Sequence, residues 1–335
     1  MAIKIIRDSK VGLDPLRGRM VAVIGYGNQG RAHARNLRDS GVKVVVGQRP
    51  GTSAERARTD GFQTMDVAKA VDGVDLVILT LPDESASEVY VDQIAPSIRS
   101  VAALGFVHGF NIRFGFIQPP ADVDVVMVAP KGPGSLLRSL YERGQGLPAL
   151  LAVHQDATAH ARDTALAWAE GIGSLRAGVV ETTFTTETET DLFGEQAVLC
   201  GGVTALCKAA FETLVEAGYE PEFAYLECVH ELKQIVDLIY ERGLTGMREA
   251  ISNTAEYGDL TRGPRVVGPV VRGEMVRILE EIRSGAFALE WIQEHRDGGR
   301  RFSKLHEADS NSALERAGEA VRALMPWLSA GNSAR

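Results

Sequence analysis

The sequence predicts an α/β fold in which an N-terminal Rossmann-type domain with a parallel sheet is followed by an all-α C-terminal domain. In the first half of the chain, short β-branched runs alternate with helical patterns, as parallel α/β sheets require. A glycine-rich turn follows the first clear strand run. From Thr182 onward strand patterns largely stop and long helical patterns run to the end. We therefore expect domains at residues 1–182 and 183–328, and a frayed small-residue tail at 329–335.

Composition and charge argue against several classes of protein. The chain has 335 residues, of which 45% are hydrophobic and 24% charged, which is enough for two domains with full cores. The net charge of -8 argues against a surface for nucleic acid or anionic membranes, since both need clustered positive charge. No apolar run approaches the ~20 residues of a membrane span, and no secretory signal is recognisable. We expect a cytoplasmic protein that acts on a small molecule, with three free cysteines.

A strand, a tight turn and a helix are predicted at residues 20–37. The turn carries Gly25, Gly27 and Gly30 in the spacing GxGxxG. Gly25 permits the turn, Gly27 lets a pyrophosphate approach the backbone, and Gly30 allows close packing of the following helix. A second strand at residues 42–47 completes a βαβ unit. The pattern favours dinucleotide binding over a plain glycine-rich turn.

The residues after the second strand bear on the choice between NAD and NADP. An acidic residue at this place binds the ribose 2′-hydroxyl of NAD, whereas a cation accommodates the 2′-phosphate of NADP. The chain offers Gln48, Arg49, Thr52 and Ser53, and no acid. One guanidinium beside two hydroxyls favours NADPH. The alternative is an arginine that is merely solvated in a surface loop.

Further strands of the parallel sheet are predicted at residues 76–81, 101–106, 123–128 and 149–153. Polar or glycine-rich turns follow three of them, at residues 82–84, 108–111 and 130–134. Because the carboxyl ends of parallel strands meet at one edge of a sheet, function is expected there. His108 and Lys131 are the candidate residues for chemistry in these turns. The alternatives are a structural histidine and a solvated lysine.

Two acidic pairs in the helical half, Asp191 with Glu195 and Glu227 with Glu231, have the spacing i, i+4. On a helix this spacing places both carboxylates on one face. Their apolar neighbours predict an interior location, where carboxylates must take up protons or bind a hard cation such as Mg2+. The alternative is a solvated helix face. Near Ser252, hydroxyls beside apolar residues predict a helix cap or a turn that contacts substrate.

Six motifs follow one another over nearly the whole chain: GYGNQG, HGFNI, APKGPG, ETDLFGEQAVLCGG, YLECVHELKQIVDLIYE and SNTAEYGD. Through these motifs the chain resembles ketol-acid reductoisomerase (acetohydroxyacid isomeroreductase) of the short, bacterial type. It implies conversion of 2-acetolactate and 2-aceto-2-hydroxybutyrate to dihydroxy acids in branched-chain amino-acid biosynthesis. It also implies use of NADPH, with NADH as a second option, and of two Mg2+ ions. The implied fold is a Rossmann domain followed by a knotted helical domain that pairs in a homodimer or higher oligomer.

The resemblance also implies roles for individual residues. Asp191 and Glu195 match metal ligands, as do Glu227 and Glu231, which in the family come from the partner subunit. His108 matches the active-site histidine, Lys131 a neighbour of the metals, Glu231 a catalytic carboxylate and Ser252 a substrate contact. The cofactor positions are Gly25, Tyr26, Gly27, Asn28, Gln29, Arg49, Thr52, Ser53, Asp83, Glu84 and Gly134. The chain departs from the family pattern at Ala86, Ser135, Thr185 and Thr186 and in a shorter loop after Arg49.

Two other functions compete with this interpretation. An NADP-dependent hydroxyacid dehydrogenase without an isomerase step would keep the N-terminal half, but it would not need four carboxylates. A non-catalytic dinucleotide sensor would bind the cofactor without consuming it. Dependence of turnover on a divalent metal separates the first from a reductoisomerase, and consumption of the cofactor separates the second.

Overall fold

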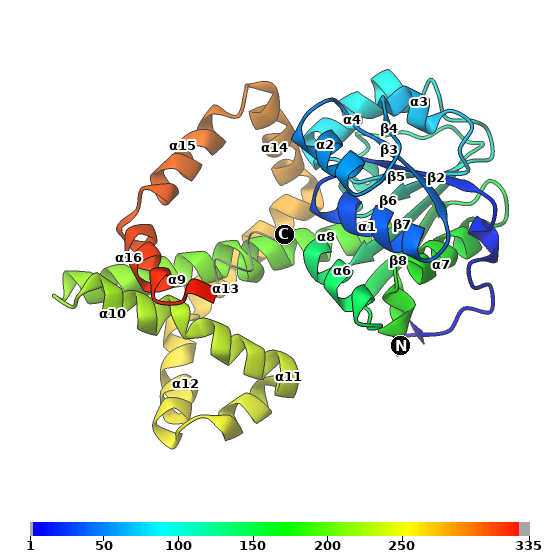
Figure 1. The fold of residues 1–335 in the computed structure, drawn as a ribbon. Coiled ribbons are helices and arrows are strands. Elements are labelled where there is room, and N and C mark those ends of the chain that lie inside the picture. The colour runs from blue at the N-terminus through cyan, green and yellow to red at the C-terminus, as the bar shows by residue number, and fades with distance from the viewer. Residues whose placement is uncertain (1–2, 328–335) are drawn as a thin grey trace. The chain divides into compact units, whose positions relative to one another are not determined.

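The computed structural model describes residues 3–327, and the chain divides into two compact units, Met1–Thr190 and Asp191–Arg335 (Figure 1). The boundary falls inside helix α8 (Phe184–Gly194). The predicted tail at 329–335 lies outside the described residues. The two units are described separately.

The first unit is built on a sheet that, in the described residues, has nine strands in the order β1-β9-β8-β7-β6-β5-β2-β3-β4. The glycine-rich turn follows β2, near one end of the order, and the strands that carry His108 and Lys131 lie toward the middle. The strands are β1 (Ile5–Ile6), β2 (Met20–Ile24), β3 (Lys43–Gly47), β4 (Thr64–Met65), β5 (Leu76–Leu79), β6 (Ala103–Phe106), β7 (Asp124–Pro130), β8 (Ala149–Gln155) and β9 (Val179–Glu181).

The sheet is mixed, which corrects one part of the sequence prediction. Strands β2 to β7 pair in parallel, as expected. The strand predicted at residues 149–153 exists as β8, but it runs antiparallel to β7, with Pro130 opposite Ala149. The chain leaves β7 and returns to β8 at the same end of the sheet, so the connection is no crossover. The short strand β1, which the sequence analysis did not predict, pairs antiparallel with β9.

Helices cover both faces of this sheet (Figure 1). They are α1 (Asn28–Asp39), α2 (Thr52–Thr59), α3 (Val67–Val71), α4 (Asp83–Val89), η2 (Tyr90–Ile94), α5 (Phe110–Arg113), α6 (Gly134–Glu142) and α7 (Ala161–Gly171), besides α8 and the short 3-10 turns η1 (Asp14–Leu16) and η3 (Ser174–Arg176). Side chains alternate between faces along each strand. Val21 and Val23 pack with Leu37 and Trp168 on one face, and Ile24 joins the core of the other face.

The second unit is helical throughout its described residues. Its elements are η4 (Glu195–Leu199), α9 (Gly201–Glu216), α10 (Pro221–Tyr225), η5 (Leu226–His230), α11 (Leu232–Ala250), α12 (Asn253–Val266), α13 (Pro269–Ser284), α14 (Ala286–Arg296), α15 (Arg300–Ser310) and α16 (Ala313–Ala323). The predicted fold class, a Rossmann-type α/β domain followed by an all-α domain, is confirmed. Whether the helical domain is knotted stays a prediction.

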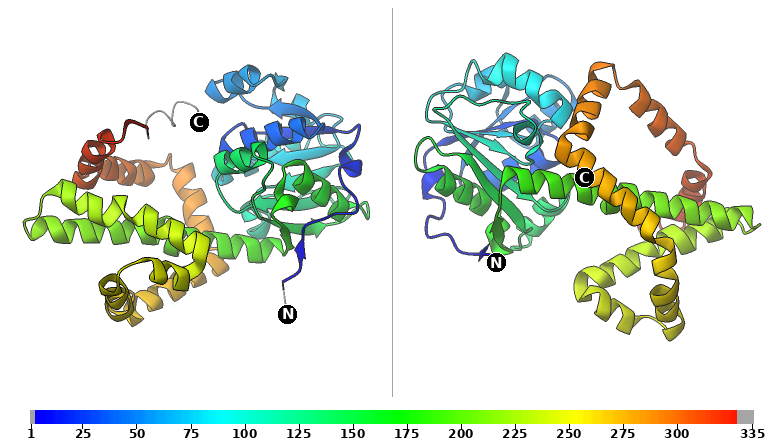
Figure 2. Two further views of the ribbon diagram at one scale, coloured as in Figure 1. Left: turned by 60° about the horizontal axis from the view of Figure 1, so that its bottom comes forward. Right: turned by 180° about the vertical axis from the view of Figure 1, so that it is seen from behind.

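The helical unit encloses little core of its own, and its helices spread out (Figure 2). A small cluster of buried residues joins α9, α10 and α16 through Phe211, Tyr225 and Val321. Many large apolar side chains are exposed instead, including Tyr240 at 86% and Val270 at 85%. These side chains are exposed in the single chain, in contrast to the buried core of the first unit.

One continuous helical stretch, Phe184–Glu216, is long and apolar enough to cross a membrane by length and composition alone. No apolar run of this length was expected from the sequence, so this expectation is corrected. Only 11% of its most apolar window is buried within the described residues of the chain. A helix that packs against other protein passes the same test, so this one helix is weak evidence for a membrane.

Candidate functional site

Two neighbouring strands and one helix bring His108, Lys131 and Glu187 together. His108 follows β6 and Lys131 follows β7, and these strands pair in parallel, so both residues lie at one edge of the sheet. Glu187 projects from the first turn of α8. Lys131 Nζ donates a hydrogen bond of 2.8 Å to Glu187 Oε1, and His108 Nδ1 lies 3.1 Å from Glu187 Oε2. The predicted pair of His108 and Lys131 therefore shares one carboxylate.

Glu187 is ionised although it is only 1% exposed. Burial would raise the pKa of this carboxyl, but the hydrogen bond and charge of His108 and the charge of Lys131 lower it to about 2. The backbone N–H of Gly109 donates a further hydrogen bond of 3.0 Å to Oε2. A side chain at Gly109 would meet Thr188 Oγ1 at 2.3 Å, so glycine is required for α8 to approach this closely.

Glu187 was not among the residues predicted for the site, and the structure corrects that omission. A usable signal was present, because Glu187, Asp191 and Glu195 continue the i, i+4 spacing for one more turn. What the spacing could not reveal is that the first of the three carboxylates is paired with the side chains of two distant turns.

The four predicted metal ligands lie on helices, in two pairs. Asp191 follows Glu187 by one turn of α8, and Glu195 opens the π-helical segment η4. Glu227 lies in a second π-helical segment, η5, and Glu231 directly follows it. π-helical segments are uncommon and occur often at functional sites. Both acidic pairs are associated with such a segment.

The expected interior location of these carboxylates is wrong for the single chain. Asp191 is half-buried, whereas Glu195, Glu227 and Glu231 are exposed. The apolar faces of the helices around them are also exposed, so an apolar neighbourhood in the sequence did not mean burial. The carboxylates keep the chemistry of a hard-cation site, because oxygen ligands suit Mg2+. Among the described residues, His108, Glu187 and Asp191 form a group of side chains that could hold a metal ion.

Ser252 is a helix cap, one of the two roles expected for it. Its Oγ accepts a hydrogen bond of 3.2 Å from the backbone N–H of Ala255 at the start of α12. The side chain is exposed.

The glycine-rich turn has the features of a dinucleotide site. Gly25 has φ 96°, which favours glycine, and a Cβ there would lie 2.9 Å from the Thr80 carbonyl oxygen. A Cβ at Gly30 would lie 2.4 Å from the Gly25 carbonyl oxygen, so glycine lets α1 pack against the turn. Helix α1 begins at Asn28 without a side-chain cap, which leaves its first N–H groups for an anion. The residues fit a bound pyrophosphate.

The side chains of Tyr26, Asn28 and Gln29 contact neighbouring parts of the protein and do not face an open site. Tyr26 is 1% exposed and packs edge-to-face on Phe62, while its hydroxyl donates a hydrogen bond of 2.8 Å to Asp60. Its N–H donates to Gln48 Oε1 at 3.1 Å. Asn28 and Gln29 contact the loop that follows Lys131. These residues can therefore meet a cofactor mainly through their backbone.

The remaining cofactor candidates lie at the starts of helices. Arg49 is exposed after β3, Thr52 is the first residue of α2, and Ser53 follows it half-buried. Asp83 and Glu84 open α4, where the Asp83 carbonyl accepts a hydrogen bond of 3.1 Å from the buried Asn111. Gly134 is the first residue of α6.

Family models match both halves of the chain. Residues 15–178 match the NADPH-binding domain of acetohydroxy acid isomeroreductase, and residues 184–327 match the C-terminal domain of ketol-acid reductoisomerase. The chain belongs to the ketol-acid reductoisomerase family. It is therefore an oxidoreductase of branched-chain amino-acid biosynthesis that uses a nicotinamide cofactor, and the predicted family and enzyme class are confirmed.

Solved structures agree with this assignment. The chain is similar to an NADH-preferring ketol-acid reductoisomerase from an uncultured archaeon, with 44% identity, a TM-score of 0.94, and coverage of 96% of this chain and 99% of that one. A semialdehyde dehydrogenase NAD-binding protein from Cupriavidus necator matches with 20% identity, a TM-score of 0.61 and coverage of 79% and 99%. A pyrroline-5-carboxylate reductase from Coxiella burnetii matches with 15% identity, a TM-score of 0.52 and coverage of 81% and 98%. The last two show likeness of fold alone.

Proposed function

We propose that this reductoisomerase converts 2-acetolactate and 2-aceto-2-hydroxybutyrate to 2,3-dihydroxy-3-methyl carboxylic acids by Mg2+-dependent alkyl migration and reduction by NADPH. The observation that carries the proposal is the buried, ionised Glu187 with His108 and Lys131 at the carboxyl edge of the dinucleotide-binding sheet. Perturbed titratable groups of this kind cluster at functional sites.

Glu187 orients the two basic groups. Its carboxylate pairs with Nδ1 of His108, which orients the imidazole so that Nε2 is the ring nitrogen that exchanges a proton with a substrate hydroxyl. It also holds the Lys131 ammonium, a donor that can bind an anionic oxygen of the substrate. The ionised state of Glu187 therefore sets the proton positions of both neighbours.

Asp191, Glu195, Glu227 and Glu231 are the residues that would hold two Mg2+ ions, with Glu231 as the catalytic carboxylate of the set. When bound, such ions acidify a hydroxyl and polarise a ketone. The carboxylates supply hard oxygen ligands, and Ser252 offers a hydroxyl to the substrate. All belong to the helical half of the chain.

We infer that both acidic pairs complete one site only when a second copy of the chain is present. The exposure of Glu195, Glu227 and Glu231, together with exposed apolar side chains on α11, α12 and α13, supports this inference. A partner helix would cover the apolar surface and place acidic residues of two chains side by side. The enzyme would then be at least a dimer, acting in the cytoplasm.

NADPH is proposed as the better cofactor. Arg49 is exposed beside the hydroxyls of Thr52 and Ser53 at the N-terminus of α2, and residues 48–53 contain no acid. A helix N-terminus and a guanidinium both favour a 2′-phosphate. The similar archaeal enzyme prefers NADH, so NADH use is the competing outcome.

The function is tested by following NADPH absorbance with 2-acetolactate and Mg2+, with and without EDTA. We expect oxidation that EDTA abolishes and that Asp191→Asn removes, while the exposed Glu212→Gln on α9 leaves it unchanged. Oxidation that is insensitive to EDTA would favour a hydroxyacid dehydrogenase. Binding of NADPH without its oxidation would favour a sensor.

A further inference from the structure

The side chains of Asn28 and Gln29, in the glycine-rich turn, hold the loop that carries Lys131. Gln29 Nε2 donates a hydrogen bond of 3.0 Å to the Gly132 carbonyl oxygen. Asn28 Oδ1 accepts one of 2.8 Å from the Ser135 N–H. The first contact is to the residue directly after Lys131, and the second caps the start of α6. The turn that offers its backbone to a pyrophosphate is thus tied by side chains to the substrate side of the site.

The two loops approach closely where Gly134 meets Asn28. A Cβ on Gly134 would lie 2.2 Å from the Asn28 carbonyl oxygen, so no other residue fits there without displacing one of the loops. Gly132 has φ 156°, and a Cβ on it would lie 3.2 Å from Leu147 Cδ2. On the opposite side, the Lys131 N–H donates a hydrogen bond of 2.8 Å to the Pro148 carbonyl. Lys131 is therefore held from both sides at its backbone.

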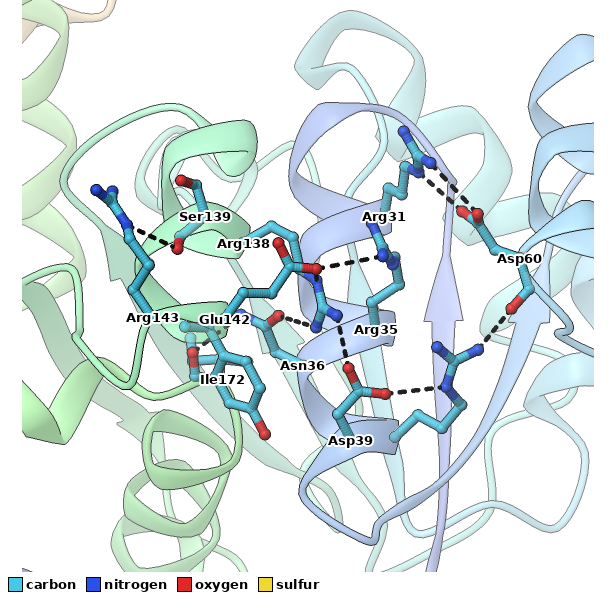
Figure 3. A network of polar contacts seen from close by, with 12 residues as sticks. Arg31, Arg35, Asn36, Asp39, Asp60, Arg138, Ser139, Glu142, Arg143 and Ile172 are labelled. Carbon is cyan, nitrogen blue, oxygen red and sulfur yellow. Dashed lines mark hydrogen bonds and ion pairs between the residues drawn. The ribbon is translucent and has the colours of Figure 1, made fainter. Parts of the chain in front are cut away.

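The helices that follow the two loops are joined by a polar network, shown in Figure 3. Arg138 of α6 donates to Asn36 Oδ1 of α1 at 2.9 Å and lies 2.7 Å from Asp39 Oδ2. Arg35 of α1 lies 3.5 Å from Glu142 of α6. Helices α1 and α6 thus form one pair, bonded along their bodies by this network and at their starts by Asn28 and Gln29. The two loops are therefore connected both directly and through the helices that follow them.

We propose that Gln29 is a positioning residue that holds the Lys131 ammonium on Glu187 through its hydrogen bond to the Gly132 carbonyl, and so couples the cofactor turn to the catalytic centre. The catalytic meaning of this coupling rests on the proposed function. The geometry is direct, because the Gly132 carbonyl is one peptide from the Lys131 backbone and Lys131 Nζ lies 2.8 Å from Glu187 Oε1. Without the Gln29 bond, the residue next to Lys131 loses its tie to the glycine-rich turn, while the Pro148 contact of Lys131 and the Asn28 contact of Ser135 remain.

The test measures the position of Lys131 without turnover. The purified full-length protein is reductively methylated at low reagent concentration, and the labelling rate of Lys131 is followed by mass spectrometry. In the unaltered protein the ammonium is held by Glu187 and its side chain is 33% exposed. Gln29→Met keeps the size of the side chain and removes the donor. We expect Lys131 to be labelled about three- to tenfold faster in this variant, the factor that corresponds to one lost hydrogen bond.

A matched control is Gln155→Met. The side-chain amide of Gln155 also donates hydrogen bonds to loop carbonyls, those of Pro120 and Val123. These lie near the start of β7, whereas Lys131 follows its end. This control should leave the labelling of Lys131 unchanged. Gln29→Asn is a second variant, because it keeps the amide but is too short by one methylene to reach Gly132. It should behave as Gln29→Met does.

Cofactor binding and turnover complete the experiment. With Gln29→Met, the Kd of NADPH, measured by fluorescence, should change less than about twofold, whereas kcat at saturating NADPH should fall about tenfold, because a small misplacement of a positioned group has a large effect on rate. The proposal is overturned if the labelling rate of Lys131 is unchanged in Gln29→Met, or if the kcat of this variant at saturating NADPH equals that of the unaltered protein. Faster labelling without reductoisomerase activity in the unaltered protein would retain the coupling and refute the proposed function instead.

Discussion

Replacing Glu187 by Gln should reveal how much the ionised carboxylate contributes to the stability of the folded protein. In the folded protein the pKa of Glu187 is about 2, compared with 4.5 for a free glutamate, because His108 and Lys131 outweigh the effect of burial. The difference of 2.5 pKa units (4.5 minus 2) corresponds to about 3 kcal/mol of stability at neutral pH, as an order of magnitude. Glu187→Gln removes this contribution together with the ion pair that Glu187 forms with Lys131.

The sign of the pH dependence follows from the direction of the shift. A carboxyl whose pKa is lower in the folded state stabilises the fold above its unfolded pKa, and this stability is lost as pH falls from 4.5 toward 2. About 2 of the 3 kcal/mol should be lost by about pH 3. Urea unfolding of the unaltered protein and of Glu187→Gln, compared between pH 7 and pH 3, measures the difference. Glu170→Gln on α7 is the control for loss of a carboxylate elsewhere in the same unit.

The two proteins should differ most at pH 7 and converge toward pH 3. A constant difference across this range would refute the reasoning, because the contribution would then not come from the ionised carboxylate. A variant as stable as the unaltered protein at pH 7 would mean that Glu187 is not anchored by its two neighbours.

Three further predictions concern other parts of the chain. Arg49→Ala should weaken the use of NADPH by about tenfold, the loss of one charge-assisted contact, and the use of NADH much less; steady-state kinetics with both cofactors decides this, and equal efficiency in the unaltered protein would refute it. His33 is fully buried, accepts a 3.0 Å hydrogen bond from Trp168, and has its pKa lowered by burial to about 3. The unfolded chain therefore binds this proton more strongly, so about 2 kcal/mol of stability should be lost as pH falls from 7 to about 5, and His33→Gln should flatten that slope in urea titrations. The active protein should be at least a dimer by light scattering, and an active monomer would contradict a shared metal site.

The sequence was sufficient for the elements whose signals are local. The βαβ unit around Gly25, Gly27 and Gly30 could be predicted because a tight turn and a close helix packing each need glycine at a fixed place. The closeness of the turns after β6 and β7 was also predictable, since neighbouring parallel strands end at one edge of the sheet. The direction of β8 was not, because antiparallel pairing depends on where the connection returns and not on the strand's own residues.

The long-range contacts of the candidate site could not be predicted from local sequence patterns either. Nothing near Glu187 in the sequence shows that its carboxylate meets His108 and Lys131, which are 79 and 56 residues away. The amides of Asn28 and Gln29 were assigned to the cofactor because they lie in its motif, yet their side chains reach the Lys131 loop. The exposure of Glu195, Glu227 and Glu231 in the single chain could not be predicted either, because an apolar helix face looks the same in sequence whether its own chain or a second copy covers it.

The most direct test of the proposed function compares two substrates in one variant. Alkyl migration develops charge on two oxygens at once, whereas reduction of a 2-keto acid polarises one carbonyl. Glu195→Gln keeps the shape of the side chain but removes one ligand charge. We predict that it nearly abolishes NADPH oxidation with 2-acetolactate and keeps an at least about tenfold larger fraction of activity with 3-hydroxy-3-methyl-2-ketobutyrate, a difference of about 1.4 kcal/mol between the two barriers. Equal fractional losses at saturating Mg2+ would contradict a preferential role of the acidic pairs in migration, and no loss with either substrate would mean that Glu195 is only part of a solvated helix face.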